Sequence, residues 1–436
     1  MESDQQREII RLQPGTGGCN AFSLPASKSI SNRLLILQAL SSIHFIIENL
    51  SEAEDTTILK NLLVKIRENT GKSDVPTILD VVHAGTTFRF LTALLAITPG
   101  NWVLTGSERM QQRPIKELVD ALKSINADIR YLKTPGFPPL QINGKPLRGG
   151  EVELESHISS QFVSALLMIA PVLPDGLKIR LKKTIVSQPY IIMTLQFLER
   201  FGVRHTWENT LISVANQPII GIDTFVEPDW SAAACWYQLI AFSKEMSVVL
   251  YGLQQKSLQG DAMLSNLFTN FGVSSRFLKE GVMLTNTGKC TDYFEQDCIQ
   301  TPDLAIALTI TCAGLGIPCC LTGLDTLVNK ESNRLLALQQ GLTGMGANVT
   351  LKNNNTIMVH GKASFSKGVV QTRNDHRLAL GFAPLAAVLG EIVLNHPDVI
   401  NKSYPDWWNH LKLLGWKVSQ SRIHDNGQDF QFYQQK

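Results

Sequence analysis

The chain has 436 residues, which is long enough for two or three domains with sizeable cores. Its hydrophobic fraction of 44% and charged fraction of 18% are typical of a globular protein, and a net charge of +2 is too small to drive non-specific binding to nucleic acid or membranes. The seven cysteines follow no zinc-binding pattern, and no apolar run is long enough to span a bilayer. We therefore expect a cytoplasmic protein with reduced thiols, in which any anion site arises from a local arrangement of charges.

Six apolar helical segments recur along the chain at intervals of roughly 55–75 residues, the scale of one supersecondary unit. Each is apolar nearly all round, which is typical of a buried helix, and each is opened by small or polar residues that can cap free N–H groups. The segments begin at Ser27, Ala84, Ser159, Asp229, Thr301 and Asn374.

A second set of segments has apolar residues at i, i+3, i+4 and i+7, and is therefore predicted to form amphipathic helices. Most end near a glycine or another small residue and lead into a strand. They begin at Glu54, Arg113, Gln188, Leu258, Glu331 and Tyr404. Strand-like runs such as 101–106 and 245–252 lie between the helices.

The repeating unit is therefore a mixture of strand, buried helix, strand and amphipathic helix. Six such units predict two domains of three units each, with a chain crossing near 226–229. We expect the buried helices at the centre of each domain and the sheets outside them.

The openings of the buried helices predict an anion site. The first turn of a helix carries unpaired N–H groups and a partial positive charge, so several such ends facing one place bind phosphate or carboxylate. Cations at these openings oppose the helix dipole, which is tolerated mainly where an anion sits alongside. The polar and charged residues at the openings are Lys28, Arg33, Arg89, Ser159, Ser160, Gln161, Asp303, His376 and Arg377.

Eight motifs follow one another in the order found in a known family. They are LPASKSISNR (24–33), HAGTTFR (83–89), LTGSERMQQRPI (104–115), SSQF (159–162), TPD (301–303), KESNRL (330–335), NDHR (374–377) and KSYPDWW (402–408). On these motifs the chain resembles the EPSP synthase family of enolpyruvyl transferases over almost its whole length.

The resemblance implies an α/β, two-domain, inverse α/β barrel-like fold. Each domain would contain three βαβαββ repeats, with buried central helices and outer sheets. The N-terminal lobe would comprise residues 25–228, and the C-terminal lobe residues 1–24 and 229–436. The lobes would close over the substrates at their interface, and the protein would be a monomer with no nucleic-acid or membrane partner.

The resemblance also implies two substrates, phosphoenolpyruvate and shikimate 3-phosphate. The implied contacts of shikimate 3-phosphate are Lys28, Ser29, Arg33, Ser159, Ser160, Gln161, Ser187, Tyr190, Asp303 and Lys330. The implied contacts of phosphoenolpyruvate are Lys28, Gly85, Arg113, Gln161, Arg334, Arg377 and Lys402. Guanidinium groups suit this second ligand because they bind carboxylate and phosphate in a bidentate manner.

Three residues are implied in the chemistry. Glu331 and Lys28 would deliver and remove a proton at the methylene carbon, and Asp303 would take the proton of the attacking hydroxyl. No electrons move in this addition and elimination, and the cations neutralise the phosphate. We therefore expect no cofactor and no metal. Glu331 among several cations is expected to favour its ionised form.

The chain departs from the family pattern at four positions. His83 stands in place of the usual asparagine, and Phe90 in place of proline. Ser332 and Asn333 stand in place of Thr-Asp between Glu331 and Arg334. The first two border the implied phosphoenolpyruvate pocket and leave its detailed shape open.

Three other functions stay open. A transferase acting on UDP-N-acetylglucosamine would have the same fold, but it typically carries a reactive cysteine in the loop that reads GSERMQQRP here. An RNA-end cyclase would need a nucleotide-linking histidine and a basic groove. A non-catalytic anion-binding scaffold would not need Lys28, Asp303, Glu331 and Arg377 together.

Overall fold

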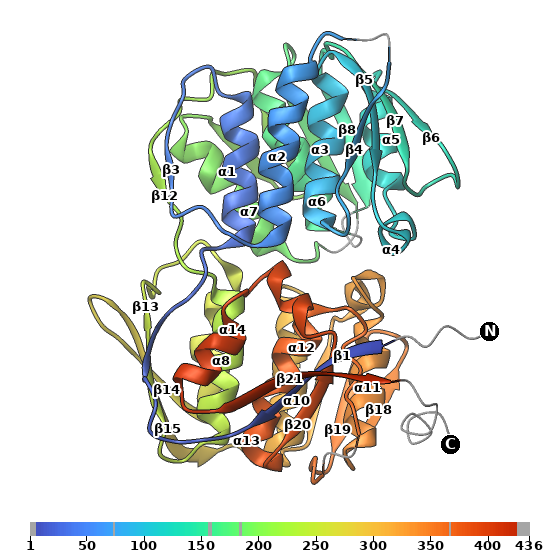
Figure 1. Ribbon diagram of the computed structural model, residues 1–436. Helices are drawn as coiled ribbons and strands as arrows, with labels where there is room; N and C mark the ends of the chain where they lie inside the picture. Colours follow the sequence, from blue (N-terminus) through green and yellow to red (C-terminus); the bar gives the residue numbers. More distant parts are fainter. Residues whose placement is uncertain (1–5, 73–74, 156–158, 183–184, 366–367, 425–436) are drawn as a thin grey trace, which may run out of the picture. The chain divides into compact units, whose positions relative to one another are not determined.

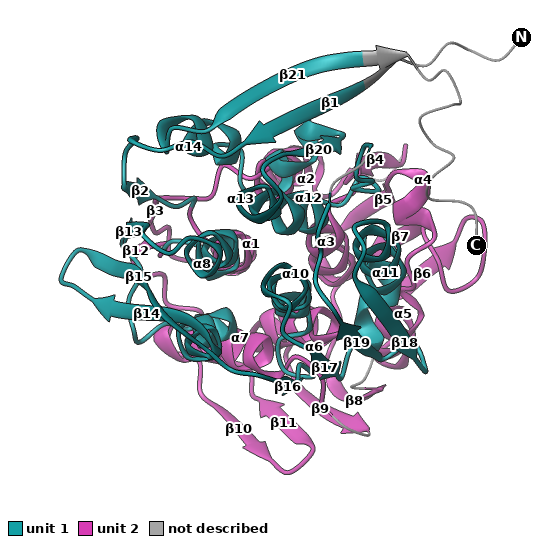
Figure 2. Ribbon diagram, turned by 90° about the horizontal axis from the view of Figure 1, so that it is seen from below, with its two compact units in different colours: residues 1–25, 228–436 teal, residues 26–227 magenta. Residues whose placement is uncertain are grey.

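The computed structural model describes residues 6–72, 75–155, 159–182, 185–365 and 368–424 (Figure 1). The chain divides into two compact units, coloured separately in Figure 2. Unit 1 comprises residues 1–25 and 228–436, and unit 2 comprises residues 26–227. The two segments that pass between the units are joined to each other by one backbone hydrogen bond in each unit. In unit 2 the Ser27 N–H donates to the Glu227 carbonyl (2.9 Å), and in unit 1 the Asp229 N–H donates to the Pro25 carbonyl (2.8 Å).

Two sheets of unit 2 share one topology, with strand orders β4-β5-β7-β6 and β8-β9-β11-β10. In each sheet the first two strands are parallel and the remaining pairs are antiparallel. A buried helix connects the two parallel strands, and an amphipathic helix leads to the hairpin. The strands are β4 (Thr77–Asp80), β5 (Gly100–Thr105), β6 (Asp128–Tyr131), β7 (Leu140–Gly144), β8 (Gly150–Glu155), β9 (Leu177–Lys182), β10 (His205–Glu208) and β11 (Leu211–Val214).

The third sheet of unit 2 is shorter. It pairs β3 (Ile47–Glu48) with β12 (Thr224–Phe225) in parallel, so the two ends of the unit meet in one sheet. The helices of unit 2 are α1 (Lys28–Leu40), α2 (Glu54–Asn69), α3 (Gly85–Ile97), α4 (Glu108–Gln111), α5 (Lys116–Ser124), α6 (Ser160–Ile169) and α7 (Gln188–Arg200).

Two sheets of unit 1 repeat the same topology, with strand orders β2-β13-β15-β14 and β16-β17-β19-β18. Again the first pair is parallel and the others are antiparallel. The strands are β2 (Ala21–Ser23), β13 (Ser247–Tyr251), β14 (Phe271–Phe277), β15 (Gly281–Cys290), β16 (Phe294–Asp297), β17 (Cys319–Thr322), β18 (Asn348–Lys352) and β19 (Thr356–His360).

The last sheet of unit 1 is completed by the start of the chain. β1 (Gln6–Gln13) lies between β20 (Ile392–Asn395) and β21 (Lys417–His424) and is antiparallel to both. Val370 adds a parallel bridge to Leu394 on β20. From Val370 through β20 and β1 to β21, the strands therefore have the same order as in the other four-stranded sheets. β1 takes the third position, which the first strand to pair antiparallel occupies in those sheets.

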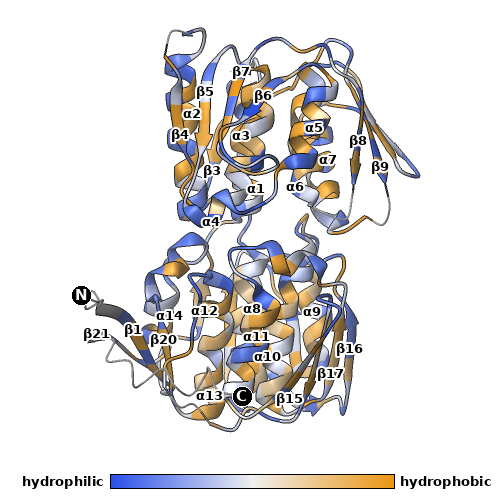
Figure 3. Ribbon diagram, turned by 90° about the vertical axis from the view of Figure 1, so that its right-hand side faces the viewer, coloured by the Kyte–Doolittle hydropathy of each residue, from blue (hydrophilic) through white to orange (hydrophobic). Residues whose placement is uncertain are grey.

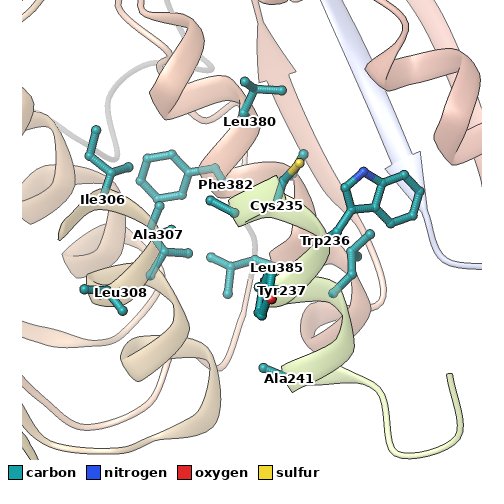
Figure 4. Packing of buried hydrophobic residues seen from close by; sticks show 14 of the residues in the cluster. Cys235, Trp236, Tyr237, Ala241, Ile306, Ala307, Leu308, Leu380, Phe382 and Leu385 are labelled. Carbon is teal, nitrogen blue, oxygen red and sulfur yellow. The ribbon is translucent and has the colours of Figure 1, made fainter. Parts of the chain in front are cut away.

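Apolar helices fill the interior of each unit. In unit 1, α8 (Trp230–Phe242), α10 (Ala305–Leu315) and α12 (His376–Phe382) lie inside, with the three sheets around them (Figure 2), and the apolar colouring of these helices is visible in Figure 3. Their side chains interlock in a continuous core that includes Trp236, Ile306 and Phe382 (Figure 4). The remaining helices of unit 1 are α9 (Leu264–Leu267), α11 (Arg334–Gly344), α13 (Ala386–Leu389) and α14 (Trp407–Leu413).

The structure confirms the expected mixed α/β fold, and six buried helices occur where the apolar segments predict them. Four amphipathic predictions need correction. The helices expected from Arg113 and Tyr404 begin three residues later, at Lys116 and Trp407. The segment from Leu258 forms a 3-10 turn (Gly260–Met263), α9 and a second 3-10 turn (Phe268–Asn270) in direct succession instead of one regular α-helix. Gly260 at the start of this stretch and Thr269 and Asn270 at its end are weak helix formers. The segment from Glu331 becomes helical only at Arg334, since Asn333 caps the helix through the Leu336 N–H (3.2 Å).

Candidate functional site

The starts of three buried helices in unit 2 carry several of the residues implied to bind anions. α1 begins with Lys28 and Ser29, α3 begins with Gly85, and α6 begins with Ser160. Each start presents N–H groups that no helical carbonyl satisfies. The side chain of Ser159 satisfies one of them, accepting from the Gln161 N–H at 3.2 Å.

Two guanidinium groups pack over Gly85. A Cβ at position 85 would lie 2.4 Å from Nη1 of Arg113 and 2.6 Å from Nη1 of Arg89. Both arginines are buried, and Arg89 donates to the Gly85 carbonyl at 2.9 Å. Only the missing side chain of glycine lets both cations approach the first turn of α3, which is a local arrangement suited to an anion.

One hydrogen bond joins the starts of α3 and α6. Nε2 of Gln161 donates to Oγ1 of Thr86 at 3.0 Å. Gln161 was expected to lie between the two substrates. Within unit 2 this bond joins the start of α3, which carries Gly85, an implied contact of phosphoenolpyruvate, to the start of α6. Ser159 and Ser160, implied contacts of shikimate 3-phosphate, lie at that second helix start.

Arg33 is buried among neutral oxygen atoms. Its Nε donates to Oγ1 of Thr194 (2.7 Å), Nη1 to the Ser29 carbonyl (2.8 Å), and Nη2 to Oγ of Ser164 and the Tyr190 carbonyl (both 3.1 Å). Burial lowers the pKa of Arg33 to about 10, so the group stays cationic at neutral pH. A buried cation held by neutral acceptors is a favourable neighbour for an anion.

The network around Arg33 also includes residues that the sequence did not single out. Oγ1 of Thr194 lies 2.9 Å from Oγ of Ser164 and 3.0 Å from the Tyr190 carbonyl, two acceptors for its single hydroxyl hydrogen. The positions of Ser164 on α6 and Thr194 on α7 do not indicate in the sequence that these residues bind Arg33, because small polar residues inside apolar helices are common.

Lys28 and Ser187 occupy distinct environments. Nζ of Lys28 lies 3.3 Å from Oδ2 of Asp55, whose side chain is buried on α2. Ser187 precedes α7 with φ 56° and ψ 38°, a left-handed conformation that is unfavourable for a serine. Such strain is concentrated at functional positions, and the predicted role of Ser187 is a contact with the phosphate of shikimate 3-phosphate.

In unit 1, the guanidinium of Arg334 is the centre of a buried cluster. Its Nε and Nη2 bind the two carboxylate oxygens of Asp375 at 2.8 and 3.1 Å. Nη1 donates to Asp303 at 2.6 Å, and Nη2 donates to Glu331 at 2.8 Å. Burial by itself would lower the pKa of Arg334, but the three carboxylates raise it above its ordinary value.

Asp303 is surrounded by cations. Besides Arg334, Nζ of Lys330 lies 3.5 Å from Oδ1 and Nη2 of Arg377 lies 3.5 Å from Oδ2. Burial would raise the pKa of Asp303, but Lys330, Arg377 and Arg334 together lower it well below its ordinary value. The group is therefore an ionised carboxylate able to accept a hydrogen bond from a hydroxyl.

Glu331 bridges two cations. Oε2 accepts from Arg334 at 2.8 Å, and Oε1 accepts from Nζ of Lys402 at 3.1 Å. Both contacts are charge-assisted hydrogen bonds, in which the donor is a cation and the acceptor a carboxylate. Arg334 and Lys402 were expected to bind phosphoenolpyruvate, and here each is engaged by a carboxylate of its own unit.

Asp375 is the residue of this cluster that the sequence analysis did not identify. Its side chain is fully buried, caps α12 through the Arg377 N–H (3.0 Å) and accepts from Oγ of Ser332 (3.0 Å). The position of an acid directly before the helix could have indicated the cap. Its second role, binding Arg334 from both oxygens, depends on tertiary contacts and has no signature in the sequence.

The structure thus groups the expected residues by unit. Those gathered in unit 2 are Lys28, Ser29, Arg33, Gly85, Arg113, Ser159, Ser160, Gln161, Ser187 and Tyr190; those gathered in unit 1 are Asp303, Lys330, Glu331, Arg334, Arg377 and Lys402. Their roles toward substrates stay predictions. Among the described residues, no group of three or more His, Cys, Asp or Glu side chains could hold a metal ion. In the same part of the chain, no helix combines the length and apolar character that crossing a bilayer requires.

Comparisons with known proteins agree on one family. The family model of EPSP synthase (3-phosphoshikimate 1-carboxyvinyltransferase) matches residues 20–411. The 3-phosphoshikimate 1-carboxyvinyltransferase of Bacteroides fragilis strain YCH46 is 42% identical over 400 residues, covering 91% of this chain and 95% of that protein. The protein of the same name from Shewanella loihica is 34% identical over 431 residues, covering 93% and 99% of the two chains.

Solved structures agree on the fold. An EPSP synthase from Acinetobacter baumannii superposes with a TM-score of 0.75 and covers 96% of this chain and 100% of that one, at 21% identity. A second structure of EPSP synthase from this organism gives a TM-score of 0.72 at 20% identity and covers 94% and 99% of the two chains.

Proposed function

Because the chain belongs to the EPSP synthase (3-phosphoshikimate 1-carboxyvinyltransferase) family, we propose that it transfers the enolpyruvyl group of phosphoenolpyruvate to the 5-hydroxyl of shikimate 3-phosphate and releases phosphate. The observation that carries the proposal is the match over residues 20–411 together with the complete set of charged residues in the two units. This reaction is a step of aromatic amino acid biosynthesis through the shikimate pathway.

The geometry supports a division of labour in the proposed addition and elimination. Asp303, ionised by its neighbouring cations, would accept the proton of the attacking hydroxyl. Glu331, held ionised between Arg334 and Lys402, suits removal of the carbon-bound proton when the double bond re-forms. In the addition that precedes this removal, Lys28, sharing the proton transfer with Glu331, would deliver the proton that the methylene carbon gains.

The other residues would bind the two substrates. Arg113, beside Gly85, suits a phosphate or carboxylate of phosphoenolpyruvate, and Arg377 is proposed to bind the same substrate. Four of the five N–H donors of Arg334 are directed at carboxylates, so this residue would contact the substrate through the second N–H of Nη1 or by exchanging a carboxylate partner. Arg33, Ser159, Ser160 and Ser187 would bind shikimate 3-phosphate.

Phosphate release from the purified protein tests the activity. We expect release only when phosphoenolpyruvate and shikimate 3-phosphate are both present. Release with UDP-N-acetylglucosamine as the acceptor would favour the sister transferase, and no release with either acceptor would favour the non-catalytic scaffold. Neither alternative is supported by a specific observation in the structure.

Two sets of variants test the residue assignments. Arg113→Ala and Arg377→Ala should each raise the KM for phosphoenolpyruvate by at least about tenfold, because each removes a charged contact. Glu331→Gln should lower kcat far more than it weakens binding. Wild-type KM values in both arginine variants, or unchanged turnover in Glu331→Gln, would remove the corresponding assignment.

The protein is further proposed to act in the cytoplasm as a monomer, without a nucleic-acid or membrane partner. Sedimentation velocity at several concentrations tests the oligomeric state. A concentration-independent monomer is the expected result.

A further inference from the structure

Arg377 has a second acceptor besides Asp303. Its Nη2 lies 3.5 Å from Oδ2 of Asp303 and donates to Oγ of Ser231 at 3.4 Å. Bonds between a guanidinium and a carboxylate are usually about 2.7–2.9 Å long. The Arg377–Asp303 pair is therefore longer than an unconstrained ion pair, and the nitrogen lies between the carboxylate and the hydroxyl.

The hydroxyl of Ser231 has a fixed direction. It donates a hydrogen bond to Oδ2 of Asp261, whose side chain is buried. With the hydrogen directed at Asp261, the lone pairs of the Ser231 oxygen are left to accept from Arg377. The Ser231 backbone is fixed as well, because its N–H donates to Oδ1 of Asp229 at 2.8 Å.

Asp261 is itself fixed against the start of α8. It lies in a 3-10 turn, Gly260–Met263, and the residue before that turn is Gln259. Nε2 of Gln259 donates to the Pro228 carbonyl at 2.8 Å, and its Oε1 accepts from the Trp230 N–H at 3.0 Å. Both bonds are buried, so the turn that carries Asp261 cannot shift relative to Ser231 without breaking them.

We propose that Ser231, oriented by Asp261, is a positioning residue that keeps Arg377 from closing fully onto Asp303. The inference rests on the proposed function, in which Arg377 binds phosphoenolpyruvate and Asp303 receives the hydroxyl proton. Without the Ser231 acceptor, Arg377 would form a full ion pair with Asp303. That pair would compete with the substrate for the guanidinium and with the hydroxyl for the carboxylate.

Ser231→Ala tests the proposal, with Ser243→Ala as the matched control. Both serines are partly exposed and flank the same helix, at its first turn and its C-cap, and replacing Ser243 leaves the Arg377 environment intact. In crystals of the Ser231→Ala protein we expect the Nη2–Oδ2 distance between Arg377 and Asp303 to shorten to about 2.8 Å. In the control it should keep the wild-type value.

Kinetics give the functional readout. Ser231→Ala should raise the KM for phosphoenolpyruvate by roughly three- to tenfold, the range for one ordinary hydrogen bond, with kcat changing less. Ser231→Thr keeps the hydroxyl and should restore the wild-type KM. A general loss of structure would instead lower kcat and would not be rescued by threonine.

The outcomes separate the two claims. An unmoved Arg377 in Ser231→Ala, or a wild-type KM in an active Ser231→Ala enzyme, overturns the positioning role while leaving the proposed function intact. A wild-type protein that releases no phosphate overturns the proposed function, and the Arg377–Asp303 distance in the variant then decides the positioning role by itself.

Discussion

Arg334 shows how one buried side chain can organise a charged cluster. It binds Asp303, Glu331 and Asp375 at once, so three acidic groups from separate parts of the chain are held around one cation. A guanidinium can do this because its donors form a rigid planar fork, whereas a lysine ammonium has no such fixed geometry. Lysine at position 334 would leave part of this cluster unpaired.

Gly85 gives a residue-scale prediction. In Gly85→Ala the new Cβ would meet the guanidinium groups of Arg113 and Arg89, which are flexible and would be displaced. The helix itself should tolerate alanine. We expect the KM for phosphoenolpyruvate to rise at least about tenfold in steady-state kinetics. The KM for shikimate 3-phosphate serves as the internal control, and an unchanged KM for phosphoenolpyruvate would contradict the arrangement.

Asp303 gives a prediction about pH. Its pKa in the folded protein lies below the ordinary value of 3.8, so the folded state binds fewer protons than the unfolded chain as the pH falls past that value. The stabilisation from Asp303 is therefore complete above about pH 5 and is lost progressively below about pH 4.

Urea unfolding from pH 7 to pH 3 measures this effect. The difference in unfolding free energy between wild type and Asp303→Asn should shrink as the pH falls below about 4. Asp292→Asn is the control, because the side chain of Asp292 is exposed and its replacement should change the free energy of unfolding little at any pH in this range. A constant difference for Asp303→Asn across the range would mean that the carboxylate is not stabilised by its neighbours.

At the scale of elements, the clearest feature is the strand that begins the described chain. β1 is the central strand of its sheet, between β20 and β21, although these lie almost 400 residues away in the sequence. Ile10 and Leu12 are fully buried in the core on one face, while Ile9 and Arg11 lie on the other face, where Arg11 forms an exposed ion pair with Glu391. The alternation fits a strand that covers the core with one face.

Leu12→Ala should therefore destabilise unit 1. Removing a fully buried leucine side chain costs about 2–5 kcal/mol, and β1 has neighbours on both sides that limit relaxation. Denaturant unfolding measures the loss. Arg11→Ala is the matched control on the same strand and should cost less than about 1 kcal/mol, since its ion pair is exposed. Equal effects of the two changes would contradict the burial of this strand.

At the scale of the whole molecule, the two units differ in how the chain builds them. Unit 2 is one continuous segment, whereas unit 1 combines both ends of the chain. The pairing of β3 with β12 closes unit 2 at its two ends. Each unit also has its own sheets and buried helices.

The segment 26–227 is accordingly expected to fold on its own, because all strand partners of its sheets lie within it. It should unfold cooperatively when followed by circular dichroism, yet release no phosphate, since Asp303 and Glu331 belong to unit 1. The full-length chain is the control. A segment without cooperative unfolding would show that unit 2 depends on unit 1 for its stability.

Most of the architecture could be predicted from the sequence because it depends on local patterns. Six apolar segments with polar openings became buried helices, and the motif order indicated the family and the reaction. Helix boundaries were less certain where capping competes with periodicity, as at Asn333, and where weak helix formers interrupt a stripe, as near Gly260. These are local effects that one sequence records only in part.

The sequence by itself determined which charged groups are available, since Lys28, Arg113, Glu331 and Arg377 could be identified from their motifs. Only the tertiary structure decided which side chain each charged group of the predicted site contacts. Asp375 binds Arg334, Asp55 binds Lys28, and Ser231 shares Arg377 with Asp303 through contacts between distant segments. The physical reason is that an ion pair depends on a distance of a few ångströms, which folding sets and which spacing along the chain does not.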